Sequence, residues 1–534
     1  MAEDSARAWT RREWLATTTA AVGVPVACPR AAHAAGGQAA TAGAQPVTSD
    51  LLLVNGRFVD HRGVVASALA VDNGRIVWLG QAGETTAADR VLDLGGRTVI
   101  PGLFDGHVHY TRAGVNPGYE ARRVERAYSI AALQETLAAR AAGVPSGAFI
   151  TCIGGWNHTQ FVERRPPTSA ELDDAAPDHA VYLSGTGGGT GALTNSRGRA
   201  FFAGRGIDVD DAGRVGNANA AVAALREAQT SGDRLRGTAD LNAHANGLGL
   251  TGVINPGVDD QDLPLRLWRE DRLTIRMRPT FPADSPEEVE ARVANNFAQD
   301  GRAVGDDLFR VAGFGERIGG RDPMGEGFER TARAIARHGW LLQQHSISPQ
   351  ENAFHLAAFQ RISAEYPLRD LRWSIIHLQQ IDEPTLRALD ALGAGASAQT
   401  WTYLSDRGGP PFRRIVDSGV PAAVGTDSTN VSALDPWASL FYMTTGRNLA
   451  GELTNDGQQI SRLEALRLYT LGAAWFAFDD HHVGSFDAGK HADLAVLSDD
   501  YLSVPEARLR SLESVLTLVG GRRVWGSGPF AVAP

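Results

Sequence analysis

Cysteine and lysine are almost absent from this sequence. Its 534 residues include two cysteines, Cys28 and Cys152, and a single lysine, Lys490, so nearly all of the 51 basic residues are arginine. If Cys28 is removed with an N-terminal leader, no intramolecular disulfide can form. The fold must then stand on its core and on any bound metal, even in an oxidising compartment.

The sequence also lacks an excess of basic residues over acidic ones. The formal net charge is -10, whereas a nucleic-acid-binding protein normally carries a basic patch. After the N-terminal region, no segment has the roughly 20 apolar residues that a membrane span needs. We therefore expect no nucleic-acid partner and no stable membrane insertion once a leader has been cleaved.

The N-terminus has the pattern of an export signal. Arg11 and Arg12 precede an apolar stretch that runs to Ala27, and the small-x-small tripeptide 32–34 offers a cleavage site. The pattern predicts a twin-arginine signal peptide over residues 1–34 and a periplasmic or extracellular location. The alternative is a disordered N-terminus with a chance arginine pair.

Short strand-like runs separated by glycine-containing turns lie at both ends of the chain. They occupy residues 48–97, with turns such as Asn55-Gly56 and Asn73-Gly74, and residues 485–530. Each end alone is too short for a core. The pattern therefore predicts a small β-sandwich domain built from both termini, with two independent β modules as the alternative.

The middle of the chain, residues 98–484, alternates strand-like and helix-like segments, which is typical of a parallel α/β fold. An insertion is expected at about 112–245. Outside it, eight apolar runs remain, at 98–104, 250–254, 274–278, 308–314, 340–345, 372–377, 395–399 and 422–427. Eight such runs predict a (β/α)8 TIM barrel, whose active site lies at the carboxyl ends of its strands.

The most informative stretch is Pro101–His109, which ends in the pair His107 and His109. Side chains alternate along a strand, so histidines two residues apart share one face. Two neutral imidazoles that converge in this way suit a divalent metal. Taken alone, the motif is more often a pair of ordinary strand histidines.

Four further polar residues fall at the ends of later predicted strands, where the chemistry of a barrel belongs. They are Glu316, His345, His377 and Asp427. Any one of them alone would be read as a structural residue, because buried histidines often hydrogen-bond within a core. Together with the first two histidines they predict a metal site.

At this point the chain resembles the amidohydrolase superfamily. The resemblance rests on Pro-Gly-Leu-x-Asp-x-His-x-His at 101–109, on Gly-Thr-Asp at 425–427 and on the closing stretch 484–497. Gly155-Trp156-Asn157 and Asp435-Pro436-Trp437 are similar to motifs of the amidohydrolase-3 branch, which includes N-substituted formamide deformylases.

The resemblance implies one or two divalent metal ions, for which we expect Zn²⁺. His107 and His109 would bind one ion, His345 and His377 the other, and Asp427 would be both ligand and base. A metal lowers the pKa of its bound water toward about 7, so hydroxide would attack a carbonyl while Asp427 passes the proton to the departing nitrogen. The expected activity is hydrolysis of a non-peptide C–N bond in an amide or N-substituted formamide.

The fourth predicted strand departs from the family pattern. Many members bridge two metals there with a carbamylated lysine, whereas this chain has Glu316, and Lys490 belongs to the C-terminal β segment. A glutamate offers two carboxylate oxygens for the same bridge. The alternative is that Glu316 pairs with Arg317 and the site holds one metal.

Five residues are candidates for substrate contacts. Trp156, Asn157 and His158 lie in the insertion, and Trp401 and Tyr403 follow the seventh strand. Core packing is the alternative for the aromatic residues.

Two rival functions remain open from the sequence. A lactonase or esterase would use the same nucleophile, and a catalytically silent periplasmic binding protein would account for the missing lysine. The oligomeric state is also open, and a homodimer is one arrangement that we consider.

Overall fold

The computed structural model describes residues 48–81, 83–84, 87–187, 189–257, 261–296, 305–320, 324–429 and 431–531. The predicted signal peptide at 1–34 lies outside these residues. Within the described ranges, no helix combines the length and the apolar character needed to cross a membrane.

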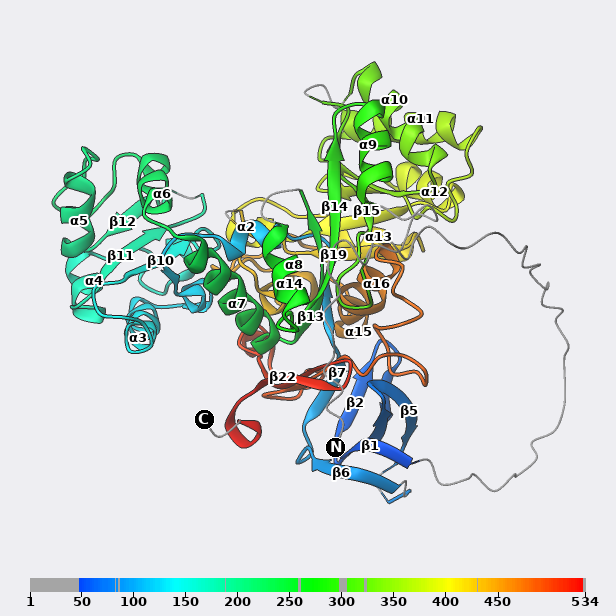
Figure 1. The fold of residues 1–534 in the computed structure, drawn as a ribbon, viewed down its shortest axis with the longest axis horizontal. Coiled ribbons are helices and arrows are strands. Elements are labelled where there is room, and N and C mark those ends of the chain that lie inside the picture. Colours follow the sequence, from blue (N-terminus) through cyan, green and yellow to red (C-terminus); the bar gives the residue numbers. More distant parts are fainter. Residues whose placement is uncertain are drawn as a thin grey trace, which may run out of the picture. The chain divides into compact units, whose positions relative to one another are not determined.

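Strands from both ends of the chain form two sheets around one core (Figure 1). The first sheet has the order β5-β4-β1-β6 and consists of β1 (Thr48–Val54), β4 (Ala68–Asp72), β5 (Arg75–Gly80) and β6 (Ala87–Asp93). The second has the order β22-β21-β20-β7-β2-β3 and consists of β2 (Arg57–Asp60), β3 (Gly63–Ala66), β7 (Thr98–Pro101), β20 (Leu494–Leu497), β21 (Ser514–Val519) and β22 (Arg522–Gly526). The predicted sandwich from both termini is confirmed.

Local sequence explains a hairpin of this domain. Asn73 and Gly74 join β4 to β5 with φ angles of 48° and 74°. Two successive residues at positive φ make the turn whose twist matches that of paired strands, and Asn-Gly adopts it most readily.

Eight parallel strands form the barrel, in the order β8-β13-β14-β15-β16-β17-β18-β19. They are β8 (Leu103–Asp105), β13 (Leu250–Pro256), β14 (Arg276–Ala283), β15 (Gly313–Ile318), β16 (Leu341–Ser346), β17 (Ser374–His377), β18 (Gly395–Gln399) and β19 (Ala422–Gly425). The last and first strands meet through Gly106 N–H, which donates to the Val424 carbonyl at 3.0 Å, and Asp427 N–H, which donates to the His107 carbonyl at 2.9 Å. The predicted TIM barrel is confirmed.

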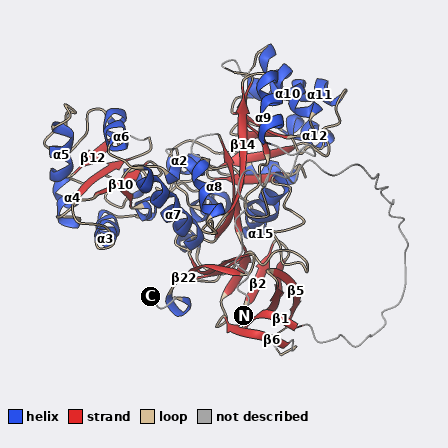
Figure 2. Cartoon of the chain, viewed as in Figure 1, coloured by secondary structure: helices blue, strands red, loops and turns tan. Residues whose placement is uncertain are grey.

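Helices follow the barrel strands (Figure 2). They are α8 (Asp262–Arg269), α9 (Pro286–Asn296), α10 (Glu326–Arg337), α11 (Pro349–Ser363), α12 (Glu383–Ala391), α13 (Phe412–Asp417), α14 (Pro436–Thr445), α15 (Arg462–Arg467) and α16 (Ala473–Phe476). In α10, Phe328, Ala332 and Ile335 recur at helical spacing and are buried in the main core. This amphipathic spacing fixes the face that the helix turns toward the barrel.

The first predicted barrel strand, 98–104, was wrong as a single element. Its first half is β7, which pairs with β2 and β20 of the sandwich, and only β8 belongs to the barrel. Gly102 lies between them, where a Cβ would come within 2.1 Å of the Thr251 hydroxyl. A glycine at this crossing allows the close approach of the chain. The predicted run 308–314 also differs, because β15 starts at Gly313 and contains Glu316.

The insertion forms a sheet of its own, with the order β12-β11-β10-β9 (cyan to green in Figure 1). Its strands are β9 (Tyr119–Glu120), β10 (Phe149–Ile153), β11 (Ala180–Ser184) and β12 (Ala192–Thr194), and the helices of this region are α2 (Tyr110–Gly114), α3 (Ile130–Ala141), α4 (Ser169–Ala175), α5 (Ser196–Ala203), α6 (Ala218–Glu227) and α7 (Ser231–Gly247). Two hydrophobic clusters lie in the insertion. It is therefore a packed unit rather than a long loop.

Candidate metal centre

All six predicted ligand residues lie at the carboxyl ends of barrel strands. His107 and His109 follow β8, Glu316 lies in β15, His345 in β16, His377 ends β17, and Asp427 follows β19. The structure brings them together in three overlapping groups, each with ligand atoms within 4.8 Å of one another. These groups are His107–His377–Asp427, His107–His109–Glu316 and Glu316–His345–His377.

Glu316 faces all four histidines. Its Oε2 atom lies 3.0 Å from His107 Nε2, 3.7 Å from His109 Nε2 and 3.9 Å from His377 Nε2. Its Oε1 atom lies 3.8 Å from His345 Nδ1. One carboxylate thus has an oxygen directed at each of the two predicted histidine pairs.

Asp427, which follows the last barrel strand, contacts three of these histidines. Its Oδ1 atom lies 3.5 Å from His107 Nε2 and 3.4 Å from His109 Nε2, and its Oδ2 atom lies 3.6 Å from His377 Nδ1. His377 Nε2 is 2.7 Å from His345 Nδ1. Nitrogen and carboxylate ligands are therefore concentrated in one small volume.

Several candidate ligand atoms are buried and make no well-directed hydrogen bond to any described residue, although His107 Nε2 and Glu316 Oε2 lie 3.0 Å apart. They are His107 Nε2, His377 Nδ1 and Glu316 Oε2. Burying a polar atom without a partner costs about 1–3 kcal/mol. A divalent cation that prefers imidazole nitrogen and carboxylate oxygen would satisfy all three, so the residues present fit such an ion.

The pKa shifts at the site favour the ligand forms of most side chains. Burial lowers the pKa of His377 to about 3 and also lowers that of His345, which keeps both imidazoles neutral. Burial raises the pKa of Glu316 and Asp427, but the neighbouring histidines outweigh it and hold both carboxyl pKa values below their usual range. The two carboxylates are therefore ionised at neutral pH.

His107 behaves differently in the metal-free protein. Burial lowers its pKa, but the nearby carboxylates of Asp427 and Glu316 outweigh burial and raise the pKa to about 10. A proton on His107 thus balances part of the carboxylate charge. Metal binding to histidine displaces such a proton.

Two of the ligand residues have strained backbones. His377 has a φ of 84° and Asp427 a φ of 58°, in the left-handed region that non-glycine residues rarely adopt. Each such residue costs on the order of 1–3 kcal/mol. The surrounding fold therefore holds these two side chains against a local preference, as is common at functional sites.

Asp105 is a positioning residue that the sequence did not single out as functional. It is fully buried, and its carboxylate accepts hydrogen bonds from Thr426 Oγ1 at 2.7 Å, Thr426 N–H and His107 N–H. Burial raises its pKa to about 7, although these hydrogen bonds oppose the rise. Asp105 therefore ties the His107 loop to the strand end that carries Asp427.

We expect Asp105→Ala to lower the free energy of unfolding by about 2–3 kcal/mol, because it leaves three buried donors unpaired. Chemical denaturation of the variant and the wild type measures this change. Asp178→Asn is the control, because the Asp178 side chain is 75% exposed and, within the described ranges, its one ion pair is a 3.8 Å contact with Arg197. Equal stability of Asp105→Ala and the wild type would contradict the positioning role.

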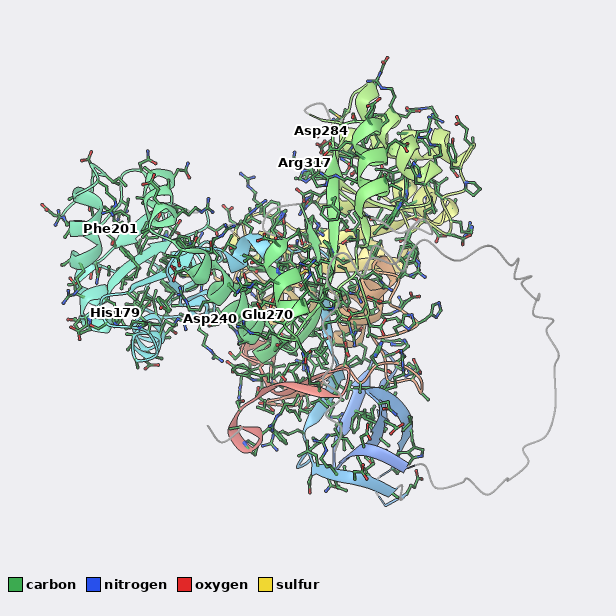
Figure 3. The ribbon with its side chains drawn as sticks, in the orientation of Figure 1. His179, Phe201, Asp240, Glu270, Asp284 and Arg317 are labelled. Atoms are coloured by element: carbon green, nitrogen blue, oxygen red, sulfur yellow. The ribbon has the colours of Figure 1, made fainter. Side chains whose placement is uncertain are left out.

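Glu316 also contacts the arginine that was considered as its structural partner. Arg317 (Figure 3) has its Nε atom 3.6 Å from Glu316 Oε1, and its side chain is 60% exposed. The other oxygen, Oε2, faces three histidines instead. The ion pair with Arg317 thus involves Oε1, and Oε2 still faces the histidines.

The five candidate substrate-contact residues differ in how far their side chains are buried. Trp156 and Tyr403 are fully buried in hydrophobic clusters, where Trp156 stacks on Phe161 at 5.7 Å between ring centroids. Tyr403 Oη donates to the Ala433 carbonyl at 3.3 Å. Both side chains therefore pack in cores, and their part in substrate binding stays a prediction.

Of the other three candidates, Asn157 links the insertion to a barrel loop. Asn157 is buried, and its Nδ2 donates to the Thr186 carbonyl at 3.0 Å and to the Leu404 carbonyl at 3.5 Å. His158 Nδ1 is 3.0 Å from the Thr190 hydroxyl. Both His158 and Trp401 are partly exposed, and their roles also stay predictions.

Another contact places the insertion next to the site. The Thr429 hydroxyl, two residues after Asp427, donates to the Ile153 carbonyl at the end of β10 at 3.3 Å. The carboxyl end of β10 therefore lies beside the loop that carries Asp427.

Comparison with known proteins agrees with the fold. An N-substituted formamide deformylase from Arthrobacter pascens is 23% identical over 88% of this chain and 97% of its own length. An uncharacterised metal-dependent hydrolase from Pyrococcus horikoshii matches at a TM-score of 0.56 with 19% identity, covering 86% of this chain and 99% of its own. The zinc complex of atrazine chlorohydrolase TrzN from Arthrobacter aurescens matches at a TM-score of 0.52 with 14% identity, covering 89% and 95% of the two chains.

The family assignment rests on most of the chain. The model of the amidohydrolase family matches residues 90–525, which include the barrel and all six candidate ligand residues. The protein therefore belongs to the amidohydrolase family of metal-dependent hydrolases.

Proposed function

We propose that this protein hydrolyses a non-peptide C–N bond in a small molecule, with N-substituted formamides as the substrate class. The observation that carries the proposal is the position of Glu316 and Asp427 among four histidines at the mouth of the barrel. The likeness to an N-substituted formamide deformylase over 88% of the chain supports the choice of formamides.

The centre is proposed to hold two divalent cations, with Zn²⁺ as the metal. His107 and His109 would hold one ion and His345 and His377 the other, because Glu316 directs one oxygen at each pair. A divalent cation in such a site lowers the pKa of water toward about 7 and polarises a carbonyl oxygen. Lys490 is engaged elsewhere, since its Nζ donates to the Asp480 carbonyl at 2.7 Å and to the Ser485 hydroxyl at 2.6 Å.

Asp427 is proposed as the general base and then the general acid. Its carboxylate is ionised and largely buried, and it lies 3.4–3.6 Å from ring nitrogens of three of the histidines, His107, His109 and His377. It can therefore accept a proton from the attacking water and deliver that proton to the departing nitrogen. The left-handed backbone at Asp427 fixes the direction of the side chain for both steps.

Export is a separate proposal, and it rests on the sequence alone. We propose that residues 1–34 act as a twin-arginine signal and that the mature enzyme works outside the cytoplasm on small molecules there. Mass spectrometry of the exported protein should give a first residue near Ala35, and an intact N-terminus would contradict the proposal.

The substrate class is tested with matched amides and esters. We expect the metal-loaded protein to release formate and an amine from an N-substituted formamide faster than it releases formate from the formate ester of the matching alcohol. Assays of formate release on both series measure the ratio. Turnover of the esters alone would favour a lactonase or esterase and contradict the proposal.

A further inference from the structure

A cleft of about 550 Å³ lies at an open edge of the β-sandwich, and none of the candidate metal ligands lines it. It is bordered by β6, the edge strand of one sheet, and by β21 and β22 at the edge of the other (Figure 1). Its volume falls within the range of about 300–1,000 Å³ that is usual for small-molecule sites.

The floor of the cleft belongs to the sandwich core. Leu51, Leu516, Leu518 and Phe530 line the cleft and are members of the buried core cluster. Leu92 lines it too and packs against that cluster. An apolar group bound here would therefore extend the core between the two sheets, which is favourable by the hydrophobic effect.

Two arginines face the cleft from opposite sheets. Arg90 of β6 pairs with Leu51, and Arg523 of β22 pairs with Leu518. Residues paired across neighbouring strands project to the same face of a sheet. Both arginines therefore project to the core-facing sides of their sheets, and both residues are exposed there because β6 and β22 are edge strands.

Among the residues that the structure describes, the side chains of Arg90 and Arg523 make no ion pair or hydrogen bond, and no acidic side chain lines the cleft. The third arginine of the lining, Arg522, is already engaged by the Asp271 carboxylate at 3.0 Å and the Leu273 carbonyl at 2.8 Å. Two free guanidiniums above an apolar floor are complementary to an anionic head on an apolar tail.

We propose that this cleft binds the anion of a medium-chain carboxylic acid, with the tail between the two sheets and the carboxylate between Arg90 and Arg523. The site is separate from the metal centre and does not depend on the proposed reaction. The competing explanation is that inward-pointing charges on edge strands prevent sheets from pairing with other chains.

Calorimetric titration of the full-length, metal-loaded protein with decanoate tests the proposal. We expect one saturable site per chain, and we expect the double variant Arg90→Gln, Arg523→Gln to bind decanoate about tenfold more weakly or worse, since charge-assisted hydrogen bonds to both guanidiniums are lost. Decanol, which has the same tail without the charge, should bind both proteins equally weakly. Arg387→Gln on α12 is the control, because its side chain is exposed and does not line the cleft.

Three outcomes would overturn the proposal. If decanoate binds the double variant and the wild type equally, the carboxylate is held elsewhere, with the metal centre as the obvious place. If the wild type shows no saturable binding, the cleft is not a site for this class of ligand. If the double variant instead self-associates in size-exclusion chromatography and the wild type binds no decanoate, the two arginines protect the sheet edges.

Discussion

The Asp427→Asn variant is expected to lose turnover by about 10²–10⁴-fold, the range typical for removal of a general acid–base group. Asparagine keeps the shape of the side chain but cannot accept a proton from the attacking water or return it to the departing nitrogen. The rate of formate release from an N-substituted formamide, at saturating substrate, measures the loss.

Two controls separate the proton-transfer role from a loss of structure. The metal content of Asp427→Asn is measured beside its rate, because Asp427 also lies 3.4–3.6 Å from nitrogens of His107, His109 and His377. Asp178→Asn repeats the same chemical change at an exposed position. An unchanged rate in Asp427→Asn would disprove its assignment as the base.

Removal of the metal is expected to abolish turnover and to destabilise the fold. The buried atoms His107 Nε2, His377 Nδ1 and Glu316 Oε2, which make no hydrogen bond among the described residues, would lose the proposed ion. A ligand that binds only the folded state stabilises it by mass action. Dialysis against a chelator, followed by rate and thermal-unfolding measurements, tests both effects.

Added Zn²⁺ should restore both the rate and the unfolding temperature of the chelated protein. Mg²⁺ serves as the comparison, because it prefers oxygen ligands and octahedral geometry to imidazole nitrogens. Full activity of a demonstrably metal-free protein would contradict the proposed chemistry.

Much of the fold and of the site follows from the sequence, because the relevant patterns are local. Strand-like runs that end in His107, His345, His377 and Asp427 belong to a barrel whose strand ends converge at one face. Parallel strands must bring such residues together whatever the details of packing. Even so, strand ends predicted from sequence are uncertain by a few residues. The predicted fourth strand ended before Glu316, whereas β15 contains it.

Features that depend on tertiary contacts could not be predicted from the sequence. The run 98–104 reads as one strand, and only the close approach of Thr251 to Gly102 shows why the chain leaves the sandwich there and enters the barrel. Asp105 looked like part of a motif, and its role appears only from its hydrogen bonds to Thr426. A signal was present in both cases, namely a glycine and a buried acid immediately before the histidine pair.

The burial of two aromatic candidates, Trp156 and Tyr403, also could not be predicted from the sequence. Trp156 and Tyr403 follow strand ends in the sequence, as substrate contacts often do, but both side chains are fully buried in hydrophobic clusters. A pattern gives the position of an aromatic residue along the chain, whereas burial decides which way the ring faces. Large aromatic side chains gain most from burial.

The central claim is that Glu316 bridges two metal ions in a site without a bridging lysine. Metal content per chain, measured by plasma mass spectrometry on the wild type and on Glu316→Gln, tests it most directly, because glutamine keeps the size of the side chain and removes the charge that faces four histidines. We predict two ions per chain in the wild type and one or none in the variant. One ion per chain in both proteins, or none in either, would contradict the bridged centre.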